Sequence, residues 1–174
     1  MKAPILVAGI GNIFFGDDAF GSEVARELMR RPLPGGVEVR DFGISGYDLA
    51  YALMDGRDAV LIDVVSRGQP PGTVFLIELD FDQVGDEAGA MFDAHSLDPV
   101  RVLQMVRSLG GRPGRLYLVG CEPSLLESED GAMGLSDEVQ AAVPLALTMI
   151  ESIFDDLLNN RTPATHAVAT KEVT

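Results

Sequence analysis

The sequence predicts an α/β fold in one domain, with an open and mostly parallel sheet covered by helices on both faces. Its 174 residues suit a single domain of ordinary size. The apolar runs are short and nearly continuous, which is typical of strands buried on both faces. Segments with helical periodicity alternate with these runs, and this alternation favours a parallel sheet.

Five segments predict strands. Residues 5–8, 59–62 and 116–119 are fully apolar, so we expect them at the centre of the sheet. Residues 37–42 alternate apolar and polar side chains, which predicts a half-exposed strand. Residues 73–77 follow Pro70 and Pro71, and proline cannot donate to a ladder, so we expect a short or edge strand there.

Four segments predict helices, at residues 19–31, 47–54, 99–109 and 137–158. The first ends at Pro32, and the last two begin after the capping residues Asp98 and Ser136. Pro144 lies inside the last helix and is a candidate kink. The domain is therefore expected to span residues 1–158, and residues 159–174, which lack any periodicity, are expected to be a disordered tail.

The charge of the chain excludes some classes of partner. Asp and Glu number 27 against 13 Lys and Arg, which gives a net charge of −14. Such a surface repels nucleic-acid phosphates and anionic membranes, so we expect neither as a partner. The apolar run from Ile5 to Ile10 is too short for a signal peptide or a bilayer span. We therefore expect a cytoplasmic protein. We also expect a monomer.

The glycine-rich turn after the first strand does not match the nucleotide-binding motifs. In a dinucleotide fingerprint counted from Gly9, the third glycine would stand at residue 14, which is Phe14. No Lys-Ser or Lys-Thr follows a glycine loop, so the P-loop pattern is also missing. Gly9 and Gly11 are explained equally well by a tight turn between strand and loop.

Three side chains follow predicted strands or loops at one edge of the sheet. Asp18 comes after the first strand, Asp63 ends the third, and His95 precedes the helix that Asp98 caps. Each has a structural explanation as well, because aspartates complement helix N-termini or cap loop amides and histidines hydrogen-bond in loops. If the first and third strands are neighbours, Asp18 and Asp63 emerge side by side. With His95 they would then suit a divalent ion such as Ni, Zn, Mn or Fe, with coordination positions left open.

The surroundings of this candidate site offer one further nucleophile. We expect Phe14, Phe15 and Phe20 to surround the Asp17-Asp18 pair with apolar bulk. Cys121, the single cysteine, ends a strand at the same edge, and His95 would be its base if it were a nucleophile. A buried structural thiol is the other interpretation. No zincin motif or serine nucleophile elbow is present.

Taken together and in order, several motifs resemble the hydrogenase maturation endopeptidase family, over residues 5–158. Singly these motifs are weak, but their order and spacing are specific. They are Gly9-x-Gly11-Asn12, Asp17-Asp18-x-x-Gly21, Gly43-x-x-Gly46, Asp63 after an apolar strand, Pro71-Gly72-Thr73, Asp93-Ala94-His95, and Val119-Gly120-Cys121-Glu122-Pro123.

The resemblance implies a three-layer sandwich around a twisted, mostly parallel sheet of five strands. It also implies an endopeptidase that removes the C-terminal extension from the precursor of a nickel–iron hydrogenase large subunit. The family's nickel contacts correspond to Asp18, Asp63 and His95, which are thus the implied metal ligands and catalytic residues. The implied metal is nickel carried by the substrate, and another divalent ion can occupy the site when nickel is absent. The family often has glutamate where Asp18 stands, one methylene longer.

The resemblance further implicates the turn after the second strand in binding the substrate, here Asp41, Gly43 and Gly46. Two mechanisms of peptide-bond cleavage remain open. Nickel can polarise the carbonyl or activate water. Alternatively, Asp18 or Asp63 can act as general base. Two other functions remain as alternatives at this point. One is a non-enzymatic nickel-binding maturation chaperone, and the other is a flavodoxin-like module that binds a nucleotide or flavin.

Overall fold

The structure is a computed structural model and describes residues 2–83, 98–124 and 133–168. The strands of this part form one sheet of six, in the order β2-β1-β3-β5-β4-β6. Neighbours among β1, β2, β3 and β5 are parallel, whereas β4 is antiparallel to both β5 and β6. The strands are β1 (Ile5–Ile10), β2 (Val37–Gly43), β3 (Asp58–Val64), β4 (Val74–Leu79), β5 (Leu116–Cys121) and β6 (His166–Val168).

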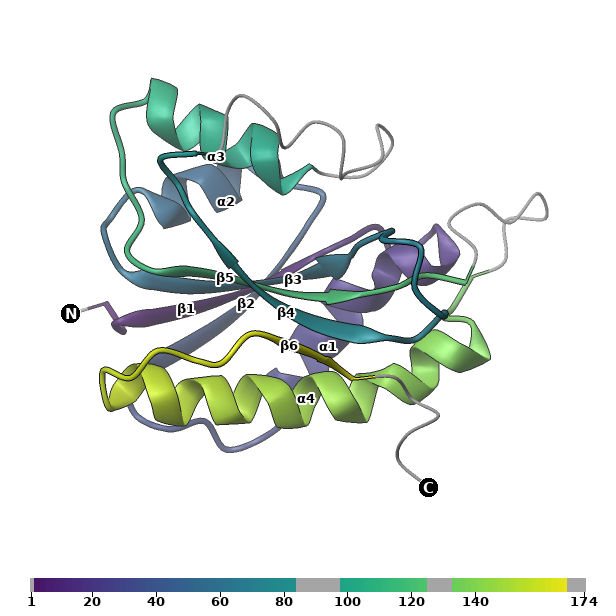
Figure 1. Cartoon of the computed structure of the whole chain (residues 1–174). Coiled ribbons are helices and arrows are strands. Elements are labelled where there is room, and N and C mark those ends of the chain that lie inside the picture. The colour runs from purple at the N-terminus through teal and green to yellow at the C-terminus, as the bar shows by residue number, and fades with distance from the viewer. Residues whose placement is uncertain (1, 84–97, 125–132, 169–174) are drawn as a thin grey trace.

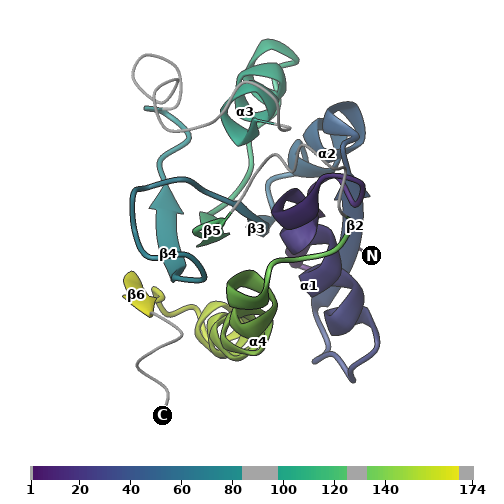
Figure 2. The ribbon, with the colours of Figure 1, turned by 90° about the vertical axis from the view of Figure 1, so that its right-hand side faces the viewer.

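Helices cover both faces of the sheet, which confirms the predicted three-layer α/β class (Figure 1). On one face lie α1 and α4, and on the other lie α2 and α3, as the view along the strands shows (Figure 2). The helices are α1 (Phe20–Met29), α2 (Gly46–Leu53), α3 (Pro99–Ser108) and α4 (Asp137–Leu158), and the short 3-10 helix η1 (Gly16–Ala19) precedes α1. None of the helices in the described ranges is long and apolar enough to cross a membrane.

Each face of the sheet has its own apolar core, because the buried strands send alternate side chains to opposite sides. Val7, Val60 and Val119 face α1 and α4. Leu61 and Leu118, their neighbours in sequence, face α2 and α3. The fully apolar runs therefore do form the central strands, as predicted.

The C-terminal segment differs from the prediction. We expected residues 159–174 to be disordered and the sheet to have five strands, but His166–Val168 form the sixth strand β6. The carbonyl and amide groups of β4 would otherwise be unpaired along its outer side, and β6 pairs with them from Val74 to Leu76. β4 is therefore not the edge of the sheet, although Pro70 and Pro71 favoured that position.

One end of the sheet is built for a close approach between helix and strands. β1 lies between β2 and β3. The chain therefore passes from β1 to the strand on one side of it, and then from β2 to the strand on the other side. At this switch point Gly21 of α1 lies against the strands, and a Cβ atom there would be 2.1 Å from the carbonyl oxygens of Ile10 and Ile62. A glycine at residue 21 is therefore required, and η1 is brought directly over the ends of β1 and β3.

Candidate active site

Asp18 and Asp63 converge at the carboxyl ends of β1 and β3. Asp18 lies in η1, which follows β1, and Asp63 is the penultimate residue of β3. β1 and β3 are parallel neighbours, with Gly9 opposite Ile62, which confirms the strand pairing on which this prediction depended. Burial raises the pKa of Asp63 well above its usual range, and the nearby charge of Asp18 raises it further.

Asp18 has one oxygen that is satisfied and one that is not. Its Oδ2 accepts a hydrogen bond of 3.0 Å from the Asn12 amide. Its Oδ1 is buried and has no hydrogen-bond partner among the described residues. Burial raises the pKa of this carboxyl, and the Asn12 amide opposes that rise. An orphaned carboxylate oxygen is costly inside a protein unless a cation or a proton reaches it.

Asp63 is even more enclosed, with 1% of its surface exposed. Its Oδ1 accepts a hydrogen bond of 2.8 Å from the amide of Val64, the next residue of the same strand. Asp63 thus does not cap the amides of a neighbouring loop in the described part of the chain. Asp98, which caps α3, is also close enough for its charge to raise the pKa of Asp63.

The two carboxylates fit a divalent cation. Like charges held together in a buried place resist ionisation, and a bound cation relieves both the repulsion and the lack of partners. Carboxylate oxygens suit hard and borderline metals. The third predicted ligand, His95, lies outside the described residues. Within the described residues no group of three or more metal-binding side chains comes together, so the structure supplies two of the three predicted ligands.

The predicted substrate-binding turn lies beside this edge, at the end of β2. Asp41 accepts hydrogen bonds from Ser22 Oγ at 2.7 Å, the Gly43 amide at 3.0 Å and Arg26 Nε at 3.1 Å. Gly43 has φ of +55°, which a glycine adopts readily, and its carbonyl accepts the Gly11 amide at 3.0 Å. The Asp41 carboxylate therefore holds the turn in place, and a direct contact with the substrate stays a prediction.

Gly46, the last residue of that predicted trio, begins α2. Its amide donates to the carbonyl of Ile44 at 3.0 Å, which closes the turn between β2 and α2. The turn therefore joins the first loop at Gly11 and presents the start of α2 next to it.

Comparison with known proteins connects this arrangement to one family. A family model described as hydrogenase maturation protease matches residues 22–153, which include Asp41, Asp63 and the glycine turn after β2. The chain belongs to the hydrogenase maturation protease family. The resemblance seen in the motifs is thereby confirmed, and so is the expectation of a peptidase. The non-enzymatic chaperone and the flavodoxin-like module, both open from the sequence, gain no support.

Relatives of known name match over most of their length. The hydrogenase 2 maturation protease of Escherichia coli is 32% identical over 152 residues, which cover 84% of this chain and 87% of that protein. The hydrogenase expression/formation protein HupD of Bradyrhizobium diazoefficiens is 31% identical over 150 residues, covering 84% of this chain and 77% of HupD.

Solved structures agree with the sequence relatives. The hydrogenase maturating endopeptidase HybD of Escherichia coli has a TM-score of 0.74 at 26% identity, and the match covers 99% of both chains. The nickel–iron hydrogenase maturation protease HybD of Thermococcus kodakarensis has a TM-score of 0.67 at 25% identity, covering 88% of this chain and 99% of that one. The protease fold thus extends over nearly the whole chain.

Two buried carboxylates of the protease were not assigned a role from the sequence. Asp17 accepts hydrogen bonds from the Ser124 amide at 2.9 Å, the Ser136 amide at 2.7 Å and Ser136 Oγ at 3.0 Å. Glu122 accepts the amides of Arg67 at 2.7 Å and Gly68 at 3.2 Å. Both hold loops at the edge where Asp18 and Asp63 lie. Their position next to strand ends was visible in the sequence, but their partners were not.

Cys121 is not the nucleophile of this protease. The thiol is fully buried, and burial raises its pKa to about 12. Its Sγ lies 3.7 Å from the carbonyl oxygen of Glu122, to which it donates. A nucleophilic cysteine instead requires a lowered pKa and access to the substrate. The structural interpretation of Cys121 is the correct one.

Of the three phenylalanines around η1, one is buried in the core and two are exposed to solvent. Phe20 is fully buried in the core, whereas Phe14 and Phe15 are 62% and 59% exposed. The expectation that all three enclose the aspartates is therefore wrong for Phe14 and Phe15, because the turn at residues 12–15 projects from the end of β1. Ile44 and Tyr47, after β2, are exposed as well. The protease thus presents large apolar side chains on the loop after β1 and around the start of α2, beside its carboxylates.

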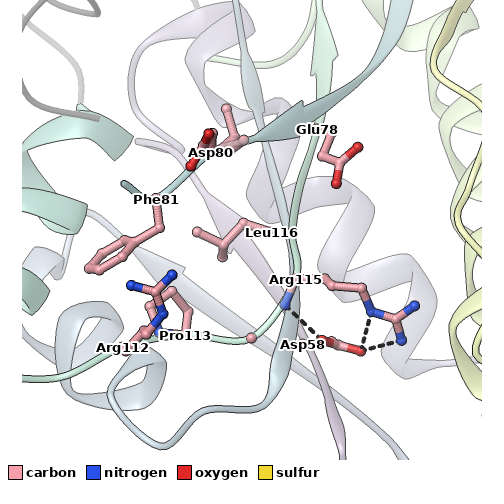
Figure 3. A pocket seen from close by; sticks show the side chains of 10 residues that line it. Asp58, Glu78, Asp80, Phe81, Arg112, Pro113, Arg115 and Leu116 are labelled. Carbon is pink, nitrogen blue, oxygen red and sulfur yellow. Dashed lines mark hydrogen bonds and ion pairs between the residues drawn. The ribbon is translucent and has the colours of Figure 1, made fainter. Parts of the chain in front are cut away.

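A cavity of about 710 Å³ lies at the opposite end of the strands from Asp18 and Asp63, where β3 and β5 begin (Figure 3). Arg115 points toward Asp58 and binds it through Nε at 3.1 Å and Nη2 at 2.7 Å. Arg112, also at this cavity, pairs with Asp82 at 2.7 Å. These arginines are occupied by ion pairs within the chain, and the cavity lies far along the strands from Asp18 and Asp63.

Proposed function

We propose that the chain removes the C-terminal extension from the nickel-loaded precursor of a nickel–iron hydrogenase large subunit. Membership in the hydrogenase maturation protease family supports the peptidase activity and a hydrogenase subunit as substrate. The observation that carries the role of nickel is the pair of buried carboxylates, one with an orphaned oxygen. The structure of this pair suits a metal that arrives with the substrate.

Asp18, Asp63 and His95 are the proposed ligands of that nickel. In the free protease, burial and mutual repulsion favour a proton on the Asp18–Asp63 pair. Binding the cation releases this proton and removes the repulsion, so affinity for a loaded precursor exceeds affinity for an empty one. Discrimination by differential binding then makes nickel insertion a requirement for cleavage.

Hydrolysis needs an activated water and a polarised carbonyl. The substrate's nickel supplies a Lewis acid beside the two carboxylates. A carboxylate oxygen of Asp18 or Asp63 that does not bind the metal would accept a proton from the attacking water.

A processing assay with purified components tests the proposal. Nickel-loaded precursor is incubated with the protein alone, and mass spectrometry follows the loss of the extension. We expect cleavage of loaded precursor only, and none with the Asp63→Ala or His95→Ala variant. Cys121→Ser is the matched control and should cleave as the unmodified protein does. Cleavage of nickel-free precursor at the same rate would contradict the role of nickel, and no cleavage at all would contradict the proposed activity.

A further inference from the structure

Adjacent aspartates in η1 face different parts of the molecule. Asp18 reaches the end of β1 through the Asn12 amide. Asp17 instead accepts hydrogen bonds from Ser124, which follows β5, and from Ser136, which caps α4. Both carboxylates are buried. Of these two aspartates, the proposed chemistry uses only Asp18, so the burial of Asp17 needs another explanation.

The 3-10 helix that carries both residues has little to hold it by itself. It has four residues, and its N-cap residue, Phe15, makes no side-chain capping hydrogen bond. On its inner side the chain is packed so tightly that a Cβ atom on Gly11 would lie 2.0 Å from the Asp18 carbonyl oxygen. On its outer side Asp17 accepts hydrogen bonds from the Ser124 amide and from the amide and hydroxyl of Ser136.

We propose that Asp17 is a positioning residue, which fixes η1 between β1 and the start of α4 so that the Asp18 carboxylate faces Asp63. Charged acceptors form stronger hydrogen bonds than neutral ones, and here one carboxylate takes two backbone amides and a hydroxyl. Ser136 also caps α4, since its Oγ accepts the Val139 amide at 3.4 Å. Asp17 thereby joins the longest helix of the described chain to the loop that bears the site.

Asp17→Asn in the full chain is the test. An Asn side chain keeps one acceptor and turns an NH₂ group toward donors that need an acceptor. The position of Asp18 is followed by NMR through the amide resonance of Asn12, which donates to Asp18 Oδ2. We expect this resonance to shift. We also expect kcat/KM for nickel-loaded precursor to fall by about 100-fold, the loss associated with a misplacement of about 1 Å.

Ile150→Val is the matched control for stability. Ile150 is buried in α4, about four turns beyond Ser136, so its truncation loosens the core without touching η1. This variant should leave the Asn12 resonance and kcat/KM unchanged at a temperature where both variants are folded. A folded Asp17→Asn variant that matches Ile150→Val in both measurements overturns the proposal.

A second variant decides the matter if Asp17→Asn does not fold. Ser124→Pro removes one amide donor to Asp17 and keeps the carboxylate. It should move the Asn12 resonance in the folded protein, and an unmoved resonance overturns the proposal. The consequence for kcat/KM rests on the proposed function, but the Asn12 measurement does not. If the unmodified protein cleaves nothing, the proposed function fails while the resonance still tests the placement of Asp18.

Discussion

Asp63 is the residue whose burial most opposes folding in this site. It is almost fully enclosed in the middle layer of the molecule, and the nearby charges of Asp18 and Asp98 add to the cost of ionising its carboxyl. In the folded state its pKa is raised, so between its unfolded and folded pKa values the native state binds more protons than the unfolded one. The free energy of unfolding therefore falls as pH rises through this window, and at higher pH the full cost of the buried charge remains.

Asp63→Asn should accordingly stabilise the protein at neutral pH while it abolishes cleavage. The amide oxygen can still accept the Val64 amide, and the buried negative charge is gone. A gain of about 1 kcal/mol corresponds to an increase of about 2–4 °C in the melting midpoint for a chain of this size. Thermal melts from pH 5 to 8 should show a gain that grows with pH. A midpoint that falls on substitution at pH 8 would contradict the buried-charge argument.

Gly21→Ala tests the close approach between α1 and the strands. The new methyl group would meet the carbonyl oxygens of Ile10 and Ile62 at 2.1 Å, and backbone atoms cannot move aside as side chains do. We expect a loss of about 3 kcal/mol, at the upper end of typical overpacking. Urea unfolding measures it. Gly35→Ala is the control, because a Cβ atom there has nothing within 4 Å, and its midpoint should be unchanged.

Residue by residue, the sequence predicted those parts of the site that follow from strand ends. Asp18 and Asp63 were found because parallel strands deliver their carboxyl ends to one edge. The role of Asp17 was out of reach, since its partner Ser136 lies 119 residues further along the chain. No local pattern marks such a pair. The exposure of Phe14 and Phe15 was missed because an apolar residue in a turn does not show which way the turn projects.

At the scale of elements, helices and central strands were predicted within a few residues, and β6 was missed. Helix α4 spans Asp137–Leu158, as its periodicity and the capping residue Ser136 predict. β6 has three residues, too few for any alternation to be seen. It exists because β4 offers an unpaired side, and only the assembled sheet shows that side.

Removing β6 gives a prediction for this element. A chain that ends before Pro163 loses the strand paired with β4 and uncovers apolar side chains such as Leu76 and Met149, which lie beside it. We expect the free energy of unfolding to fall by about 1–2 kcal/mol from the newly exposed apolar surface, with cleavage retained. A chain that ends at Val168 keeps β6 and should melt at a higher temperature than the chain that ends before Pro163. Equal midpoints for both truncations would show that β6 contributes nothing to stability.

At the scale of the whole molecule, the surface combines a strong negative charge with large apolar groups beside the site. Phe14 and Phe15 follow β1, and Ile44 and Tyr47 follow β2, all of them more than half exposed. Exposed aromatic side chains are enriched where proteins bind one another. A precursor that presents its nickel to Asp18 and Asp63 would cover this region.

Phe14→Ser combined with Tyr47→Ser should raise KM for the nickel-loaded precursor and leave kcat nearly unchanged. A loss of about 1.4 kcal/mol in binding corresponds to a tenfold weaker affinity. Met29→Ser is the control, since Met29 is also an exposed apolar residue but lies at the far end of α1. Steady-state kinetics measures both parameters. Equal KM values for the double variant and the control would remove these side chains from substrate binding.

The enclosure of Cys121 has a practical consequence for studying the maturation reaction. The chain has a single sulfhydryl, and in the folded protein it is fully buried with its pKa raised to about 12. Maleimides and iodoacetamide react with accessible thiolates, so they should not label the native protease. In a mixture of protease and precursor, any label incorporated under native conditions then reports on the thiols of the precursor alone, before and after cleavage.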